Sequence, residues 1–228
     1  MKKLFLISLL FISSNLFSQD VNLLIQRVKE KLAKVNDYEA TGRMKTNVVF
    51  LKVPVANVKI YYKKPNRLKI KNEKGISFIP KGAVSISMDN LVAGNDYTII
   101  DGGISKIGYS NVRMVKLLPN DDNSNVVLST LYIDEANAVI RKAKTTTKDN
   151  GSFELDMTYG NFTQYGLPDK VIFSFNTKDY KMPKGVTFDF DDGENQKSAD
   201  KMKNRKGKVE IDYKSYIINK GVNDEAFK

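Results

Sequence analysis

Most of the chain after residue 37 alternates between apolar and polar side chains, and this alternation restricts the fold more than any other feature. Successive side chains of a β-strand point to opposite faces, so a period of two predicts strands with one buried face. Between residues 38 and 50, every second residue belongs to one mostly apolar set, and the residues between them include Glu39, Arg43 and Lys45. Such a strand belongs to a sheet that buries one face and exposes the other.

The alternation, interrupted by turn residues, predicts about ten strands, and short turns between strands favour antiparallel pairing. The predicted strands cover residues 38–50, 58–63, 67–71, 97–101, 104–118, 126–133, 138–147, 152–159, 171–175, 186–190 and 209–219. Gly102 and Gly103 are the predicted hairpin turn after residue 101, and Gly108 is a predicted bend or bulge. Residues 88–93 are a predicted helix of one or two turns, and the last strand is expected at an edge of the sheet.

Residues 21–35 have apolar side chains at helical spacing, with Asp20 as the expected N-cap. One amphipathic helix is too small to cover a sheet of this size, so the sheet must curl around its apolar face. The predicted fold is therefore mainly β with α: a single large curled antiparallel sheet, an unclosed half-barrel, covered by the N-terminal helix and short lid helices. A two-sheet sandwich satisfies the same alternation.

Residues 1–18 are predicted to be a signal peptide. Lys2 and Lys3 precede the apolar run of residues 4–12, which is too short to span a bilayer, and cleavage is expected after Ser18. No Cys follows the run, so we expect no lipid anchor there and a periplasmic location. Residues 19–192 are then one half-barrel domain, and residues 193–228 a basic linker with an extra strand packed on that domain.

The residue types that the chain lacks exclude most catalytic chemistry. The sequence contains no Cys, no His and no Trp. Nucleophilic pairs that use His, zinc or haem held by His or Cys, and disulfides are all impossible without these side chains. We therefore expect no cofactor, no metal and no enzymatic activity. An enzyme of this composition would have to rely on a carboxylate, a Tyr or a buried Lys.

Positive charge exceeds negative charge and is unevenly distributed. The formal net charge is +11, and removal of residues 1–18 lowers it to +9 because two lysines are lost. Basic residues are concentrated at 59–74 and 197–208. An exported protein meets anionic membranes or acidic proteins rather than nucleic acid, so this charge predicts such a partner, unless it is only a solvated surface.

Two groups of carboxylates are candidate sites. Asp189, Asp191, Asp192 and Glu194 resemble a calcium loop, but the EF-hand spacing requires glycine where Glu194 stands, so a solvated acidic turn is favoured. A glycosidase requires a pair of carboxylates at a defined distance. Asp101, Asp121 and Asp122 are candidates for such a pair, but nothing in the sequence fixes the distance between them.

Three stretches of the chain resemble the periplasmic outer-membrane lipoprotein carrier family, the LolA-like proteins. The first is the N-terminal helix that runs into a strand at residues 37–40, and the second is residues 61–68, with a basic residue before Pro65. The third runs from residue 131 through the turn at 149–151 to residues 182–186. The resemblance covers about residues 20–192, with residues 76–120 poorly matched, and it implies an unclosed β-barrel whose hollow receives acyl chains.

The resemblance implies roles for particular residues. Lys64 stands where the family has a basic residue before Pro, usually Arg, which latches the lid helices, so Lys64, Leu24 and Val28 are the expected lid or latch residues. Lys lacks the planar donor fork of Arg. The expected acyl-chain pocket consists of Met44, Val58, Ile60, Tyr62, Leu68, Ile70, Phe153, Leu155, Met157, Phe173 and Phe175, each of which is also a core position on base rates. Lys59, Lys63, Arg67 and Lys71 are the expected surface for an acidic partner or anionic headgroups.

The sequence thus leads to two functional hypotheses. The first is a monomeric carrier or chaperone that shelters lipoprotein or other lipid chains and transfers them toward the outer membrane, with a possible inner-membrane transporter and outer-membrane acceptor as partners. The second is an envelope sensor or scaffold that binds a membrane protein with the same fold and moves no cargo.

Overall fold

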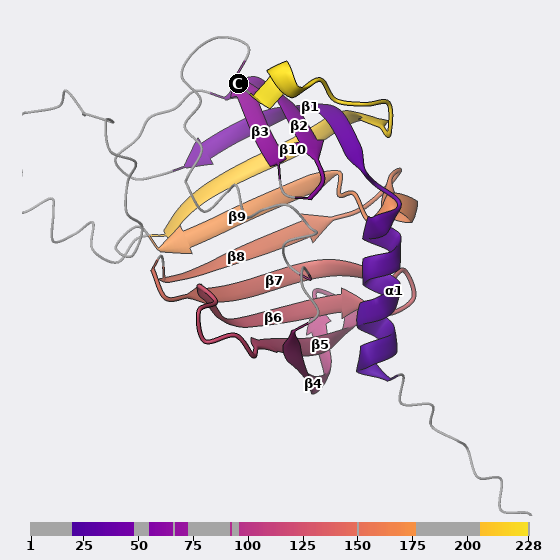
Figure 1. Ribbon diagram of the computed structural model, residues 1–228, viewed down its shortest axis with the longest axis vertical. Helices are drawn as coiled ribbons and strands as arrows, with labels where there is room; N and C mark the ends of the chain where they lie inside the picture. Colours follow the sequence, from indigo (N-terminus) through magenta and orange to yellow (C-terminus); the bar gives the residue numbers. More distant parts are fainter. Residues whose placement is uncertain are drawn as a thin grey trace, which may run out of the picture.

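The computed structural model describes residues 20–47, 55–65, 67–72, 92, 96–149, 151–176 and 206–227. Within these residues the chain forms one α-helix, ten strands and two short 3₁₀ helices (Figure 1). The predicted signal peptide, the predicted helix at 88–93 apart from Val92, and the predicted strand at 186–190 lie outside them. The structure describes no helix with the length and hydropathy needed to cross a membrane.

Helix α1 (Val21–Ala33) begins where the sequence predicts. The Asp20 side chain accepts a hydrogen bond from the backbone N–H of Asn22 at 2.8 Å, which satisfies one of the donors that a first helical turn leaves unpaired. The apolar stripe faces the sheet, and its buried members are Leu24, Ile25, Val28 and Leu32.

The ten strands form one antiparallel sheet, so the single-sheet prediction is confirmed over the sandwich. The strands are β1 (Asp37–Asn47), β2 (Ala56–Lys63), β3 (Arg67–Asn72), β4 (Tyr97–Ile107), β5 (Ser110–Pro119), β6 (Val126–Asp134), β7 (Val139–Thr147), β8 (Gly151–Thr158), β9 (Lys170–Asn176) and β10 (Lys206–Ile218). Their order across the sheet is β3-β2-β1-β10-β9-β8-β7-β6-β5-β4.

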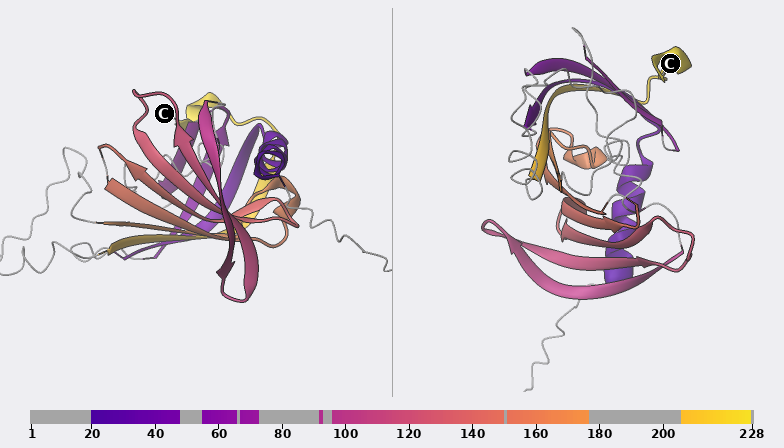
Figure 2. Two further views of the ribbon diagram at one scale, coloured as in Figure 1. Left: turned by 90° about the horizontal axis from the view of Figure 1, so that it is seen from below. Right: turned by 90° about the vertical axis from the view of Figure 1, so that its left-hand side faces the viewer.

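The sheet curls but does not close, which makes the predicted half-barrel (Figure 2). β3 and β4 lie at its two ends, and α1 runs across the strands on the concave side. The 3₁₀ helix η2 (Thr163–Tyr165) follows β8, and η3 (Asp224–Phe227) follows β10.

The prediction that the last strand lies at an edge is wrong. β10 lies in the interior of the sheet, where it pairs with β1 over Tyr38↔Ile218 to Asn47↔Lys208 and with β9 on its other side. It therefore joins β1–β3 to the strands β4–β9. Its alternation fits an edge strand and an interior strand equally well, because a local pattern fixes the faces of a strand and not its neighbours.

The predicted turn between β4 and β5 is also wrong. β4 continues through Gly102 and Gly103 as a bulge, and the hairpin turns at Gly108, which has a φ of 58°. The Asp101 side chain accepts a hydrogen bond from the Gly103 amide at 2.8 Å, and Gly103 has a φ of 78°, a conformation that side chains other than glycine rarely adopt. Two glycines in sequence thus form a bulge, and one glycine forms the turn.

Candidate functional site

The concave face of the sheet carries one continuous group of apolar side chains, which we call the concave cluster. Every residue of the predicted acyl-chain pocket belongs to it or packs against it. All of these side chains are buried except Leu68, which is partly buried. They are Met44, Val58, Ile60, Tyr62, Leu68, Ile70, Phe153, Leu155, Met157, Phe173 and Phe175.

The strand register places these side chains in rows across the sheet. On β1–β3, Ile60 lies between Ala40 and Ile70. On β8 and β9, Leu155 lies opposite Phe173. The Phe173 ring is 5.6 Å from the Phe153 ring and 5.3 Å from the Phe175 ring, measured between centroids. The two groups of predicted residues are therefore parts of one apolar surface.

The strand that connects these two groups was not predicted as part of the site. β10 contributes the buried Val209 and Ile211, which lie opposite Phe173 and Val171 on β9. The far half of the sheet continues the cluster through Val115, Leu117, Leu131, Ile133 and Ala143. The same alternation in sequence would have identified these residues.

Helix α1 covers the concave cluster with Leu24 and Val28, both of which are buried. Hydrogen bonds from the Arg27 and Lys31 side chains to the carbonyls of Ala136 and Asn137 join it to the turn between β6 and β7. The predicted lid residues therefore do contact the cluster.

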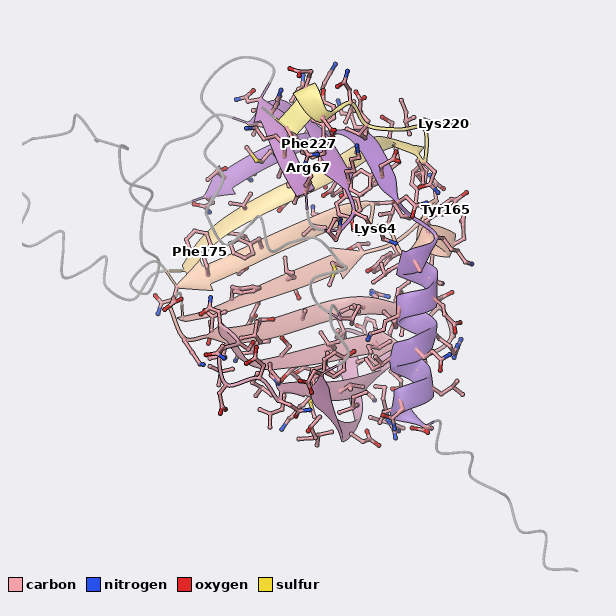
Figure 3. All side chains as sticks on the ribbon, in the orientation of Figure 1. Lys64, Arg67, Tyr165, Phe175, Lys220 and Phe227 are labelled. Carbon is pink, nitrogen blue, oxygen red and sulfur yellow. The ribbon has the colours of Figure 1, made fainter. Side chains whose placement is uncertain are left out.

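Lys64 contacts the C-terminal end of α1. Its ammonium donates to the Ala33 carbonyl at 3.1 Å and approaches the Leu32 carbonyl at 3.4 Å. The Leu32 carbonyl also accepts a hydrogen bond from the Val35 amide at 3.1 Å. A cation at the last turn of a helix interacts favourably with the helix dipole. The Asn219 side chain donates to the next carbonyl, that of Lys34, at 2.7 Å. The end of α1 is thus held by side chains from the β2–β3 turn and from the segment after β10 (Figure 3).

A group of aromatic rings packs together on β1, β2 and β10. The Tyr38 ring stacks on Tyr62 at 5.1 Å and meets Tyr216 edge-on at 5.3 Å. Phe162 and Tyr213 pack on Tyr216 at 4.9 and 5.0 Å, and the Tyr216 hydroxyl donates to the Pro168 carbonyl. Burial raises the pKa of Tyr213 and of Tyr216, because a phenolate would lose its hydration there.

A cleft of about 380 Å³ opens between α1 and β4. Its volume falls within the range of small-molecule sites. Ile25 and Ile99 provide its apolar lining, and the Lys29 ammonium lies 4.9 Å from the centre of the Tyr97 ring. Asn22 and Gln26 complete the lining. The cleft was not predicted, because it depends on where the helix packs.

The predicted docking residues lie together on the convex face of β2 and β3. Lys59 is opposite Lys71, and Lys63 is opposite Arg67. Two of these four cations bind the same carboxylate within the chain: Asp224 lies 2.8 Å from the Lys63 ammonium and 2.6 Å from the Arg67 guanidinium. The predicted docking surface therefore already binds an acidic group of the same chain. The sequence pattern could not predict this contact, because Asp224 is far from β2 and β3 in the sequence.

Asp101 does not have the electrostatic surroundings of a glycosidase acid. The Gly103 amide and the Arg113 guanidinium both hydrogen-bond Asp101 and lower its pKa, whereas a general acid in a glycosidase requires a raised pKa. No group of three or more acidic side chains within the described ranges is arranged to hold a metal. The predicted acidic turn at residues 189–194 lies outside those ranges.

Known proteins resemble this chain in fold and not in sequence. No protein-family model and no curated protein sequence matches it. A Vibrio parahaemolyticus domain named for outer membrane lipoprotein sorting superposes with a TM-score of 0.55 at 10% identity, over 91% of this chain and 97% of its own. A LolA superfamily protein from Nitrosomonas europaea gives a TM-score of 0.51 at 11% identity, over 90% and 97%. The chain has the LolA-like fold.

A third solved structure extends the comparison. A DUF1329 family protein from Desulfovibrio piger superposes with a TM-score of 0.52 at 12% identity, over 90% of this chain and 94% of its own. Each alignment spans at least 90% of this chain and of the solved structure, so the likeness extends over the whole fold and is not limited to a part of it. The resemblance predicted from sequence is confirmed at the level of the fold.

Proposed function

We propose that this protein binds the acyl chains of a lipoprotein or another lipid on the concave cluster, beneath α1, and passes them on toward the outer membrane. The binding is non-covalent and needs no catalytic group. The observation that carries the proposal is the continuous apolar surface of the concave face beneath helix α1. The LolA-like fold, shared with a domain named for lipoprotein sorting, supports it.

The energies of lid and cargo are of the same order. Fully burying a Leu, Ile or Val side chain contributes about 1.5–3 kcal/mol, so the four buried side chains of α1 contribute roughly 6–12 kcal/mol. An acyl chain contributes about 0.8 kcal/mol per buried methylene, or roughly 8 kcal/mol for ten of them. A lipid can therefore replace the helix on the sheet and can leave again, as a carrier requires.

The remaining assignments belong to the same proposal. Leu24, Val28 and Lys64 form the lid and its latch, and the cleft beside Tyr97 is the entry for the chain. Lys59 and Lys71, with Lys63 and Arg67, face partners at the membranes. The protein acts in the periplasm as a monomer after cleavage behind Ser18, which N-terminal sequencing of the exported protein tests.

A reversible lock on α1 tests the carrier function. Because the chain lacks Cys, the double variant Gln26→Cys with Ile99→Cys carries thiols only on the two walls of the cleft, and Gln26 is exposed. A reducible bis-maleimide joins α1 to β4. We expect the joined protein to take up fluorescent fatty acid at least tenfold more weakly than the same protein after reduction. The two single variants, treated identically, are the controls.

Two results would count against the proposal. Equal uptake before and after reduction would show that α1 does not gate the site. Native mass spectrometry of protein isolated without detergent that consistently shows no bound lipid, together with rejection of added lipoprotein, would favour the sensor or scaffold instead. A stable membrane-protein partner, recovered at low salt and insensitive to lipid, would then identify that function.

A further inference from the structure

The segment Asn223–Phe227, which we call the tail segment, folds back on the β2–β3 turn. Asp224 bridges Lys63 and Arg67, and the Arg67 guanidinium lies 4.2 Å from the centre of the Phe227 ring. Figure 3 labels Phe227, at the end of η3, next to Arg67. A single 3₁₀ turn thus presents a carboxylate and an aromatic ring, three residues apart, to two cations on neighbouring strands.

We propose that Lys63 and Arg67 form a docking site for an acidic and aromatic segment of a partner protein, and that the tail segment fills this site within the chain until the partner displaces it. The ligand chemistry is that of the tail itself: a carboxylate between the two cations and an aromatic ring on the guanidinium. The proposal goes beyond lipid binding and would stand without it.

The contacts of the tail segment are of the kind that exchange. The side chains of Lys63, Arg67 and Asp224 are 39%, 41% and 63% exposed. Exposed ion pairs contribute little to stability because both groups stay hydrated and salt screens them. The tail segment competes well only because its attachment gives it a high effective concentration. A partner with additional contacts can therefore replace it.

The residues just before the tail segment anchor it independently of the ion pairs. The Asn219 side chain accepts a hydrogen bond from the Asn36 amide at 2.7 Å, and the Gly221 amide donates to the Asp37 carboxylate at 2.9 Å. Val222 is buried. The η3 turn can therefore leave the β2–β3 surface while the chain up to Val222 stays in place.

The surroundings of the site favour an acidic partner. Lys59 and Lys71 lie on the same convex face as Lys63. Farther along the sheet, on β7 to β10, lysines pair with carboxylates on neighbouring strands: Lys142 binds Glu154, and Lys170 binds Glu210. On β2 and β3 the carboxylate comes instead from the tail segment. A surface that obtains its counter-charge from a separate segment attracts negatively charged partners once that segment leaves.

Binding of the tail sequence as a free peptide tests the proposal. The probe is a fluorescein-labelled peptide with the sequence of residues 220–228, and the receptor is the full chain with Asp224→Ala and Phe227→Ala. We expect this double variant to bind the peptide and the wild type to bind it at least about tenfold more weakly, because its own tail segment competes. Lys63→Ala with Arg67→Ala, added to the double variant, should abolish binding. Lys144→Ala, a change of an exposed lysine on the convex face of β7, is the matched control and should leave binding unchanged.

The measurement is fluorescence anisotropy at low salt, with thermal unfolding of each variant as the folding check. The proposal is overturned if the peptide does not bind the double variant. It is also overturned if adding Lys63→Ala and Arg67→Ala to the double variant leaves peptide binding unchanged. Anionic vesicles of phosphatidylglycerol and phosphatidylethanolamine that sediment the double variant, when the peptide does not bind, would assign the surface to a membrane. Fatty-acid uptake, measured in parallel, reports separately on the carrier function.

Discussion

Replacing Lys64 by Met removes the ammonium that holds the last turn of α1 while it keeps an unbranched apolar stem. The lost contacts are the hydrogen bond to the Ala33 carbonyl at 3.1 Å and the longer one to the Leu32 carbonyl at 3.4 Å. A hydrogen bond to a charged group contributes about 1.5–3 kcal/mol, and a cation at a helix C-terminus about 0.3–1 kcal/mol. The second bond is long, so we take about 2 kcal/mol for the whole loss.

A loss of about 2 kcal/mol raises the opening equilibrium of α1 by roughly 30-fold, since 1.4 kcal/mol is a factor of ten. Native-state hydrogen exchange, followed at the α1 amides, measures this directly. We expect protection to fall in α1 and to stay unchanged in β7 and β8. Lys59→Met, on the exposed face of the preceding strand β2, is the matched control. Equal exchange in α1 for both variants would refute the latch, and a uniform loss of protection across the sheet would show a general stability effect instead.

Three further predictions concern the tail, the concave cluster and the segment after β10. Hydrogen bonds from Lys63 and Arg67 lower the pKa of Asp224 below its ordinary value of 3.8. The tail contact is therefore fully present above pH 3.8 and is lost as the pH falls through the lowered pKa, and amide chemical shifts in η3 should report this transition. Phe173→Ala should lower the free energy of unfolding by about 3–5 kcal/mol in urea, because the side chain is 1% exposed, whereas Ile172→Ala on the opposite face should cost far less. Asn219→Ala should cost about 2 kcal/mol through the lost hydrogen bonds that its side chain makes, and Asn219→Gly should recover only the part due to its positive φ of 57°.

The net positive charge of the protein divides into two kinds of surface. Where β7 to β10 meet, lysines face carboxylates on neighbouring strands, as in the pair Lys170 and Glu210 at 2.6 Å. The hydrogen bond to Glu210 raises the pKa of Lys170, because the carboxylate stabilises the charged ammonium. On β2 and β3 the cations outnumber the carboxylates, and Asp224 supplies negative charge from outside the sheet. Charge within the sheet thus supports strand pairing, whereas two cations at its β3 end bind a carboxylate from η3.

The sequence by itself determined which side chains share a face. The alternation of β2 separates Val58, Ile60 and Tyr62 from Lys59 and Lys63, because consecutive residues of a strand point to opposite sides whatever the neighbouring strands are. For this reason, the predicted pocket residues all belong to the concave cluster or pack against it. The helix and its cap were predictable for the same reason, since both depend on residues close together in the chain.

Only the tertiary structure decided which distant segments meet. The pairing of Tyr38 with Ile218, the bridge from Asp224 to Lys63, and the packing of α1 over β4 all join residues far apart in the sequence. Local patterns fix the face of a strand and leave its partner open, since the apolar face of β10 could be buried beside several other strands. Three features therefore depend on the assembled sheet: the position of β10, the binding of Asp224 by Lys63 and Arg67, and the cleft at Tyr97. Each depends on contacts between distant segments, which form only when the chain folds.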